Sequence, residues 1–368
     1  MKRILLAVTN DLITDYRVHR TATALQEMGF DITVVGSIFR DKSELKRPYP
    51  VHRLDMFFRK GRLFYFEFNT RLFLFAIRGG YDLFVANGLG SLTGIEFTAF
   101  WKRKPFVYDS HDLFTESAEM IGKPVTRWFW QFIEKSLSRK ARRVYTISES
   151  IAAFLETKYR IKVDLIRNTP EIQSVRNFPP EYRLVHEGLK VLIYQGAVNR
   201  GRGLEMIIKA MKYLPEAMFF IVGEGAEEET LEKLVLKNSL YNRVIFYGRV
   251  QFEELKFITM QADLGLSAEE DICLNYRYSL PNKLFDYIHA GIPVLVSGGE
   301  EMEKLVSERQ IGHVIADRSP EKLAAQIREM LSDDELVKKW RANSAATAQE
   351  FNWSKEKDRL IEIYREFL

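Results

Sequence analysis

The chain of 368 residues has only one cysteine, Cys273, so it cannot form an internal disulfide. It also lacks a run of apolar residues long enough to cross a membrane. Its apolar start stops at Asn10 without a small-residue cleavage site, so we interpret this stretch as a first strand and not as a signal peptide. We therefore expect a cytoplasmic protein.

A strong net charge is also absent, because the formal value is only +4. This small value hides an excess of ten positive charges in residues 1–170 and of six negative charges in the remainder. A basic first half suits anionic lipid, nucleic acid or a phosphorylated substrate, and charge alone does not choose among these partners.

Short apolar runs alternate with helical patterns along the whole chain, which predicts an α/β fold with two doubly wound, Rossmann-like domains facing each other across a cleft. Proline, asparagine and charged residues replace the periodic pattern in residues 168–188. We place an N-terminal domain at residues 1–175 and a C-terminal domain at residues 176–350. A last helix within 351–368 is expected to pack back on the first domain.

The segment YQGAVNRGRGLE (194–205) leaves a predicted strand, turns through glycines and enters a helix. Backbone amides of such a turn bind anions, and Arg200 and Arg202 add donors suited to phosphate. A tight turn with solvated arginines is the alternative. IVGEG (221–225) is a similar turn, but the glutamates that follow it would repel a phosphate, so a plain turn is favoured over contact with a base or sugar.

The segment SLPNKLFDYIHAG (279–291) predicts a helix that Ser279 caps and Gly291 ends. Lys283 lies in its first turn, where the helix dipole is already positive, so an anion such as a diphosphate is expected in front of it. Asp286 follows one turn later and suits the hydroxyls of a ribose. The alternative is an ion pair between Lys283 and Asp286 within the helix.

Polar residues also follow two predicted strands of the first half. DSHDLFTES (109–117) contains His111, which is suited to hydrogen-bond a sugar or a leaving group, although a structural histidine is the alternative. NDLITDYRVHR (10–20) supplies Asp15 and Arg17, either as contacts to an acceptor or as a helix cap and surface charge.

Together these motifs resemble those of the family 4 nucleotide-sugar glycosyltransferases, which have the GT-B fold. The resemblance rests on DYRVHR, YDSHDLF, YTISESIAAFL, YQGAVNRGRGLE, IVGEG and SLPNKLFDYIHAGIPVL, spans nearly the entire chain and is strongest at residues 190–315. It implies transfer of a sugar from a UDP- or GDP-linked donor to a hydroxyl of a glycan or polyprenyl-linked acceptor, in the synthesis of cell-surface polysaccharide.

The resemblance also implies site roles, no cofactor and no metal. By this resemblance, the catalytic residue would be His111, the N-terminal domain would bind the acceptor and the C-terminal domain would bind the nucleotide sugar. The diphosphate would be bound by Arg202, Lys283, Gly201, Arg200 and Asn282, the ribose by Asp286, the donor sugar or base by Gly196, Gly223, Gly225, Tyr278 and Ser279, and the acceptor by Asp15, Arg17, Asp109 and Glu116.

The chain departs from the family pattern at two positions. Ala197 stands where members usually have an arginine, for which Arg200 is expected to compensate, and Tyr278 replaces the first of two signature glutamates. Retention of configuration is the expectation, but the second replacement leaves the stereochemistry open. SLPNK is similar to the Ser-x-(Pro/Ser)-x-Lys arrangement of several GT-B enzymes of polysaccharide assembly.

The first half concentrates basic and aromatic residues in 52–80, 101–105 and 127–143. We expect most of these aromatics to pack in the core, with Leu63, Phe66, Leu72, Phe73 and Ile77 forming one helix face. The exposed arginines and lysines are expected to hold the protein at the inner face of the cell membrane. A nucleic-acid partner is not expected, because the predicted anion loops lie in the acidic half. A non-catalytic sugar-nucleotide or nucleic-acid binding protein and a sugar-nucleotide epimerase are the alternative functions.

Overall fold

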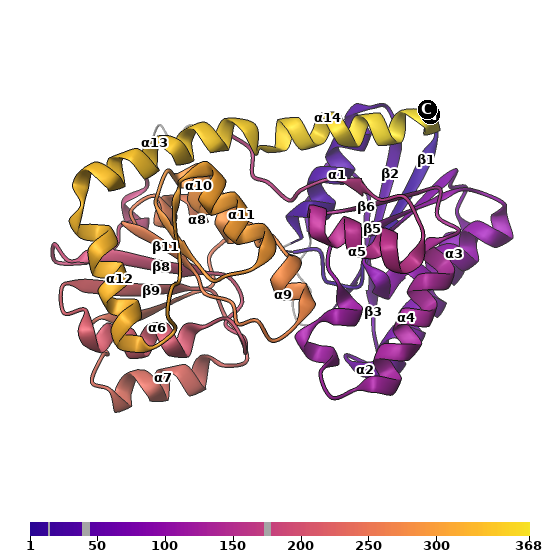
Figure 1. Cartoon of the computed structure of the whole chain (residues 1–368). Coiled ribbons are helices and arrows are strands. Elements are labelled where there is room, and N and C mark those ends of the chain that lie inside the picture. The colour runs from indigo at the N-terminus through magenta and orange to yellow at the C-terminus, as the bar shows by residue number, and fades with distance from the viewer. Residues whose placement is uncertain (14, 39–44, 173–177) are drawn as a thin grey trace. The chain divides into compact units, whose positions relative to one another are not determined.

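The computed structural model describes residues 1–13, 15–38, 45–172 and 178–368. These residues form two compact units, Met1–Asn168 with Ser354–Leu368, and Thr169–Trp353 (Figure 1). The predicted boundary between residues 175 and 176 lies outside the described residues. Within the described ranges, every helix is either too short or too polar to span a bilayer.

The first unit contains a seven-stranded parallel sheet with the strand order β3-β2-β1-β4-β5-β6-β7 among its described residues. Its strands are β1 (Arg3–Ala7), β2 (Asp31–Ile38), β3 (Val51–Asp55), β4 (Leu83–Asn87), β5 (Phe106–Ser110), β6 (Arg143–Thr146) and β7 (Asp164–Leu165). Its helices are α1 (Tyr16–Glu27), α2 (Gly61–Arg78), α3 (Leu89–Lys102), α4 (Pro124–Ser138), α5 (Glu149–Tyr159) and most of α14 (Trp353–Tyr364).

The end of the chain contributes to the core of this first unit. The hydroxyl of Tyr364 lies 3.4 Å from that of the fully buried Tyr145 on β6. Just beyond α14, the carboxylate of Glu366 accepts hydrogen bonds from Arg142 and Arg143. The last helix is thus fixed by both a buried aromatic pair and surface ion pairs.

The second unit contains a six-stranded parallel sheet with the order β10-β9-β8-β11-β12-β13 among its described residues. Its strands are β8 (Lys190–Gln195), β9 (Ala217–Val222), β10 (Val244–Gly248), β11 (Leu264–Ser267), β12 (Val294–Val296) and β13 (Gly312–Val314). Its helices are α6 (Leu204–Ala210), α7 (Glu228–Lys237), α8 (Phe252–Thr259), α9 (Leu274–Tyr278), α10 (Asn282–Ala290), α11 (Glu300–Arg309), α12 (Pro320–Ser332) and α13 (Asp334–Glu350).

Alternating residues of the central strands build two hydrophobic layers in the second unit. Leu192 and Tyr194 of β8 face the layer formed with α6, α7 and α12, whereas Val191 and Ile193 face the layer formed with α8, α10 and α11. A parallel sheet covered on both faces needs strands that are apolar on both sides, which is why these segments read as continuous apolar runs.

The predicted buried face of the helix in segment 63–77 is wrong. Helix α2 buries Phe64, Phe68, Leu72 and Ala76, whereas Leu63 and Phe66 are 55% and 71% exposed. The helix is apolar around most of its circumference, so the spacing of large side chains does not determine which stripe faces the sheet. Other large aromatics of α3 and α4 are also exposed, so core packing does not account for most of them.

Candidate functional site

The chain order of the second sheet reverses between β8 and β11, which lie side by side. In open α/β sheets, ligands bind beyond the carboxyl ends of the strands at such a reversal. Gly196 follows β8 and Ala268 follows β11. The loops that begin at these two residues, together with the start of α10, form the candidate site of this unit.

Two cations from different elements meet there on one carboxylate oxygen. The Nζ of Lys283, in the first turn of α10, lies 2.6 Å from Oε1 of Glu269, and a nitrogen of Arg202 lies 3.4 Å from the same oxygen. The other oxygen of Glu269 accepts a hydrogen bond of 2.7 Å from Ser267. The predicted convergence of Arg202 and Lys283 is therefore present in the structure, with a protein carboxylate between them.

The cluster is buried, which makes its charges interact strongly. The side chains of Lys283 and Glu269 are 7% and 3% exposed, and the Lys283 ammonium lies 4.1 Å from the ring centroid of Tyr194. Burial by itself would raise the pKa of Glu269, but Lys283 and Arg202 lower it to about 2. The carboxylate is thus ionised at neutral pH, and the three groups together carry one net positive charge.

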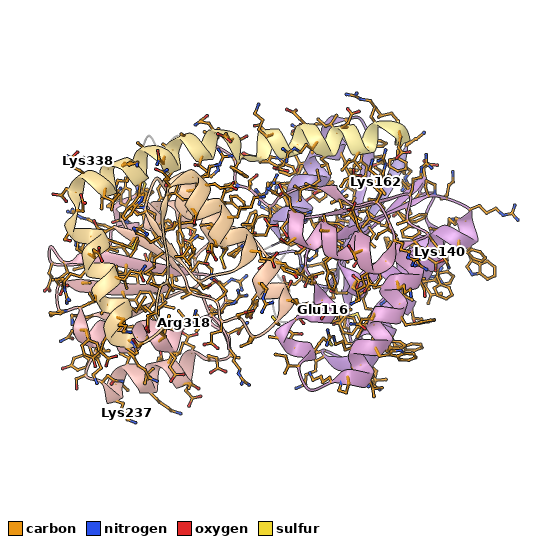
Figure 2. All side chains as sticks on the ribbon, in the orientation of Figure 1. Glu116, Lys140, Lys162, Lys237, Arg318 and Lys338 are labelled. Atoms are coloured by element: carbon orange, nitrogen blue, oxygen red, sulfur yellow. The ribbon has the colours of Figure 1, made fainter. Side chains whose placement is uncertain are left out.

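Backbone contacts hold the two loops of the site together. The amide of Glu270 donates to the carbonyl of Gly201. Arg318, whose side chain is labelled in Figure 2, donates to the carbonyls of Ala268 and Glu269. Gly203 has φ of +72°, and a Cβ there would lie 2.0 Å from the carbonyl oxygen of Ala268. This glycine is therefore required by the close approach of the loops.

The turn at residues 223–225 packs on the first loop in the same way. A Cβ on Gly223 would lie 2.0 Å from the carbonyl oxygen of Gly196, and one on Gly225 would lie 2.1 Å from that of Val198. These close backbone contacts explain why glycine stands at both positions, without any role in binding a ligand. Arg200 is exposed on the first loop, outside the buried cluster.

Helix α10 begins later than the sequence predicts. Its first residue is Asn282, and Pro281 occupies the N-cap position with extended backbone angles. Ser279 instead is the C-cap of α9: its amide donates to the carbonyl of Asn275, and its hydroxyl lies 3.5 Å from the carbonyl of Tyr276. The prediction that Ser279 caps α10 is wrong, since Pro281 restricts the preceding backbone to extended conformations. Tyr278 is the last residue of α9.

Asp286 binds Gln195, whereas Lys283 binds Glu269. Its Oδ2 accepts a hydrogen bond of 2.8 Å from Gln195, the last residue of β8, and the carbonyl oxygen of that amide accepts from Thr259. The alternative of an intrahelical pair between Lys283 and Asp286 is wrong, because Lys283 binds Glu269. Asp286, Thr259 and His289 line a cavity of ≈ 390 Å³ within this unit.

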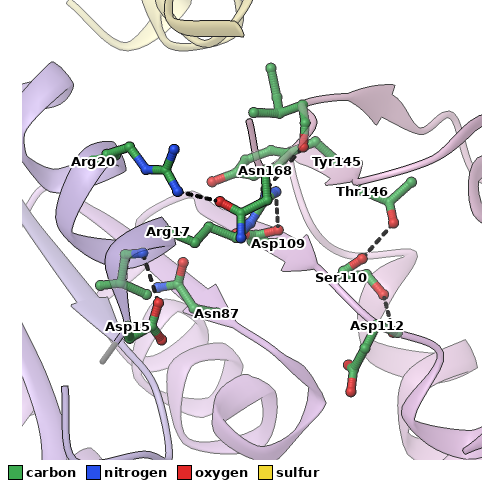
Figure 3. A network of polar contacts seen from close by, with 12 residues as sticks. Asp15, Arg17, Arg20, Asn87, Asp109, Ser110, Asp112, Tyr145, Thr146 and Asn168 are labelled. Carbon is green, nitrogen blue, oxygen red and sulfur yellow. Dashed lines mark hydrogen bonds and ion pairs between the residues drawn. The ribbon is translucent and has the colours of Figure 1, made fainter. Parts of the chain in front are cut away.

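In the first unit, Arg17 and Asp109 bind each other. Both side chains are buried, and the guanidinium makes two hydrogen bonds of 2.8 Å to the two carboxylate oxygens of Asp109 (Figure 3). Burial by itself lowers the pKa of Arg17, but Asp109 raises it above the ordinary value. Asp15 caps α1 by accepting from the amide of Val18. These three predicted acceptor contacts have structural partners.

Glu116 also has structural partners. It accepts hydrogen bonds from Arg127, Gln131 and Lys158, and its side chain is 3% exposed. The acceptor-binding role of Asp15, Arg17, Asp109 and Glu116 stays a prediction.

His111 lies in a different environment, at the carboxyl end of β5. Its Nδ1 is buried and has no hydrogen-bond partner, and the same is true of Oδ1 of Asn87 at the end of β4. Gly88 follows β4 with φ of +80°, and a Cβ there would lie 3.1 Å from the His111 ring. Buried polar atoms normally have partners, and these two lie at the carboxyl ends of the neighbouring strands β4 and β5.

The sequence reasoning missed Glu269. The pattern of cations and glycines after the strands predicts an anion beside Lys283, but it does not indicate that a protein carboxylate supplies one. The signal was the acidic segment AEED at residues 268–271, directly after a predicted strand. A buried lysine and a nearby arginine require a counter-charge, which the nearest acidic residue supplies.

Comparison with known proteins agrees with this architecture. Residues 15–169 match the model of Glycosyltransferase Family 4, and residues 180–347 match that of Glycosyl transferases group 1. An uncharacterized glycosyltransferase of Methanocaldococcus jannaschii is 25% identical over 268 residues, which cover 69% of this chain and 66% of that protein. The chain therefore spans slightly less than two thirds of this relative, and smaller shares of the other curated relatives that it matches.

Solved structures share the fold at low sequence identity. Sucrose-phosphate synthase from Thermosynechococcus elongatus aligns with a TM-score of 0.82 and 19% identity, covering 100% of this chain and 99% of its own. HepE of Anabaena in complex with UDP-glucose aligns with a TM-score of 0.76 and 17% identity, covering 100% of both chains. The predicted fold class, two Rossmann-like α/β domains of the GT-B type, is confirmed. The chain belongs to family 4 of the glycosyltransferases.

Proposed function

We propose that this protein transfers a glycosyl group from a nucleoside diphosphate sugar to a hydroxyl of its acceptor. The observation that carries the proposal is the convergence of Arg202 and Lys283 at the reversal of strand order in the second unit. Two cations from separate elements at this place suit the two phosphoryl groups of a diphosphate. The UDP-glucose bound to the similarly folded HepE supports this class of donor.

Each residue of the site then has a chemical task. Arg202 and Lys283 would neutralise the charge that develops on the diphosphate as the bond to the sugar breaks. The amides of Gly201 and Asn282 and the guanidinium of Arg200 would add donors to the phosphates. Asp286 would accept hydrogen bonds from the ribose. Gly196, Gly223, Gly225, Tyr278 and Ser279 are proposed to surround the sugar and the base.

The leaving group needs no metal in this proposal, because protein cations supply the positive charge. Among the residues that the structure describes, there is no group of three or more histidine, cysteine or acidic side chains placed to hold a metal ion. Metal independence stays a prediction, which an assay with a chelator would test.

We further propose a lipid-linked glycan acceptor, a retaining reaction in cell-surface polysaccharide synthesis, and a location at the inner face of the cell membrane. These proposals rest on the family and on the similarity of SLPNK to polysaccharide-assembling enzymes. His111 is assigned to the reacting sugar or its acceptor, because its ring carries a buried nitrogen without a partner.

Nucleotide binding is the first test. In a thermal-shift series with UDP, GDP, ADP and their sugars, we expect one nucleotide class to raise the melting temperature. Arg202→Ala should weaken that binding by about tenfold or more, because it removes one of the two cations that converge on Glu269. Arg328→Ala is the matched control, since Arg328 forms a surface ion pair with Glu216 on the same unit. Equal binding by the Arg202 variant and the wild type would contradict the phosphate assignment.

Exposed aromatic side chains of α3 and α4 support the proposed membrane contact. These two helices lie side by side in the first unit (Figure 1). We call their exposed large side chains the apolar face; it consists of Phe97, Phe100, Trp101, Val125, Trp128, Phe129 and Phe132. Such a patch on a protein surface marks an interaction site. Exposed basic residues of the same segments, Arg103, Lys104, Lys123, Lys135, Arg139 and Lys140, suit anionic headgroups.

Membrane binding is tested with vesicles. Wild-type protein should co-sediment with vesicles containing phosphatidylglycerol and much less with vesicles of phosphatidylcholine alone. A double variant, Trp101→Ser with Trp128→Ser, should lose about tenfold or more of this binding, because each exposed indole contributes apolar area to the interface. Tyr241→Ser, which changes an exposed aromatic residue of the second unit, is the control. Unchanged binding of the double variant would remove the apolar face from the proposal.

A further inference from the structure

The cation site of the second unit already contains an anion. Oε1 of Glu269 contacts both Lys283 and Arg202, while Oε2 is fixed by the hydroxyl of Ser267. The carboxylate thus presents one oxygen to the two groups that would bind a donor diphosphate. Since all three charges lie close together and Glu269 is 3% exposed, water screens their interaction only weakly.

We propose that Glu269 is a built-in counter-anion that limits the affinity of the site for nucleoside diphosphates. This inference rests on the proposed function and concerns its regulation. With Glu269 ionised, a bound diphosphate meets one net positive charge from this cluster instead of two. The phosphates must also share the Lys283 and Arg202 donors with the carboxylate, which retains both contacts in the unliganded protein.

A carboxylate between the two cations would have two effects in an enzyme: it stabilises the unliganded site, and it favours release of the product. Without a ligand and without Glu269, the buried Lys283 and the partly buried Arg202 would repel each other, and the dipole of α10 would repel Lys283. Glu269 removes this cost, so the site is stable before the donor arrives. The same carboxylate lowers the affinity of the site for the nucleoside diphosphate that remains after transfer, which favours release of this product. Arg318 and Ser267 keep the Glu269 loop in place, so the counter-anion does not need to leave when phosphate binds.

If Glu269 had a purely structural role, its removal would change the diphosphate affinity in the opposite direction. If Glu269 only positions Lys283 and Arg202, removing its charge disorders the two cations and weakens phosphate binding. If Glu269 limits affinity electrostatically, removing its charge strengthens binding even though the unliganded protein becomes less stable. The direction of the change in affinity therefore separates the two roles.

The test is calorimetric titration of Glu269→Gln with UDP, UMP and uridine, and with GDP, GMP and guanosine. We expect about tenfold tighter binding of the preferred nucleoside diphosphate, because one negative charge several ångströms from the phosphates is removed. The gain should be smaller for the monophosphate and absent for the nucleoside. Glu270→Gln is the matched control, since both cations pair with Glu269 and, within the described ranges, neither pairs with this neighbouring carboxylate. Unchanged or weaker diphosphate binding by the Glu269 variant would overturn the proposal.

A double variant keeps the proposal testable if Glu269→Gln does not fold. Replacing both members of the pair, Glu269→Gln with Lys283→Met, leaves no unpaired buried carboxylate and is expected to be tolerated. Compared with Lys283→Met alone, the double variant should bind the diphosphate about tenfold more tightly, because the net charge beside the phosphates rises by one unit. Equal affinities of the double and the single variant would show that Glu269 acts only by positioning Lys283.

Failure of the inference differs from failure of the proposed function. If the wild type and all variants bind none of the nucleotides, the donor site itself is wrongly assigned. If the wild type binds a nucleoside diphosphate and Glu269→Gln does not bind it more tightly, the donor site stands and the counter-anion proposal falls.

Discussion

Replacing Lys283 with methionine is expected to weaken the binding of the preferred nucleoside diphosphate by about 100-fold, since a charge-assisted hydrogen bond is lost. Methionine keeps most of the length and the apolar stem of the lysine side chain but lacks the ammonium, so the change is largely one of charge. The cluster then contains Arg202 and Glu269 alone, and its net charge falls from one positive unit to zero. Both the lost donor and the lost charge act against phosphate.

The same substitution should also lower the free energy of unfolding by about 3 kcal/mol, because Glu269 loses its nearest buried partner. The loss should depend on pH. In the wild type, the lowered pKa of Glu269, about 2, stabilises the folded state above the ordinary glutamate pKa, and this contribution disappears as the pH falls toward 2. With Lys283 removed, the pKa of Glu269 rises, so the difference in stability between variant and wild type should be larger at pH 7 than at pH 3.

Isothermal titration and chemical denaturation at several pH values measure these effects. Lys322→Met is the matched control, because Lys322 forms an exposed ion pair with Asp317 on the same unit. A Lys283 variant that binds UDP and GDP as the wild type does would refute the proposed diphosphate site. A stability loss without any loss of affinity would make Lys283 a purely structural partner of Glu269.

Replacing His111 with alanine is expected to lower turnover by about 100- to 1,000-fold while leaving nucleoside diphosphate affinity unchanged. The reason is the location of this ring in the first unit, where it carries a buried nitrogen without a partner, whereas the predicted phosphate ligands belong to the second unit. Loss of a group that contacts the reacting sugar or its acceptor should appear in the rate of transfer, or in slow donor hydrolysis, rather than in nucleotide binding.

Two further variants identify the nitrogen that acts. Asparagine places a polar atom near the position of Nδ1 and glutamine near that of Nε2, so partial recovery by one of them assigns the contact. His52→Ala is the control, because His52 lies exposed on β3 of the same unit and packs against Phe75. Full turnover by His111→Ala would leave this histidine as a structural residue.

Local sequence patterns predicted the alternation of strands and helices and the end of helix α10. The run KVLIYQ predicts β8 because every residue after the first is apolar or borders the turn at Gly196, and Gly291 predicts the end of α10 because it adopts φ of +68° there. The start of α10 was predicted too early, since Ser279 has the chemistry of a cap but ends α9. Strand β3 was not predicted, because VHRLD has only weak alternation. Among the described residues it is an edge strand that pairs with β2.

The apolar faces of individual helices were harder to predict than their existence. In α2, large apolar residues occur on nearly every side, and only the packed structure decides that Phe64 is buried and Phe66 is exposed. The spacing of apolar residues fixes a buried face only where polar residues occupy the other faces.

The sequence by itself determined that the chain has two parallel α/β units, that cations and glycines follow the strands of the second unit, and that Lys283 needs a nearby anion. These features depend on residues close together in the chain, where spacing and helix electrostatics suffice. Only the tertiary structure decided which anion that is. The partners of Lys283 come from the ends of β8 and β11, and the order in which strands pair, not their distance in sequence, brings those ends together.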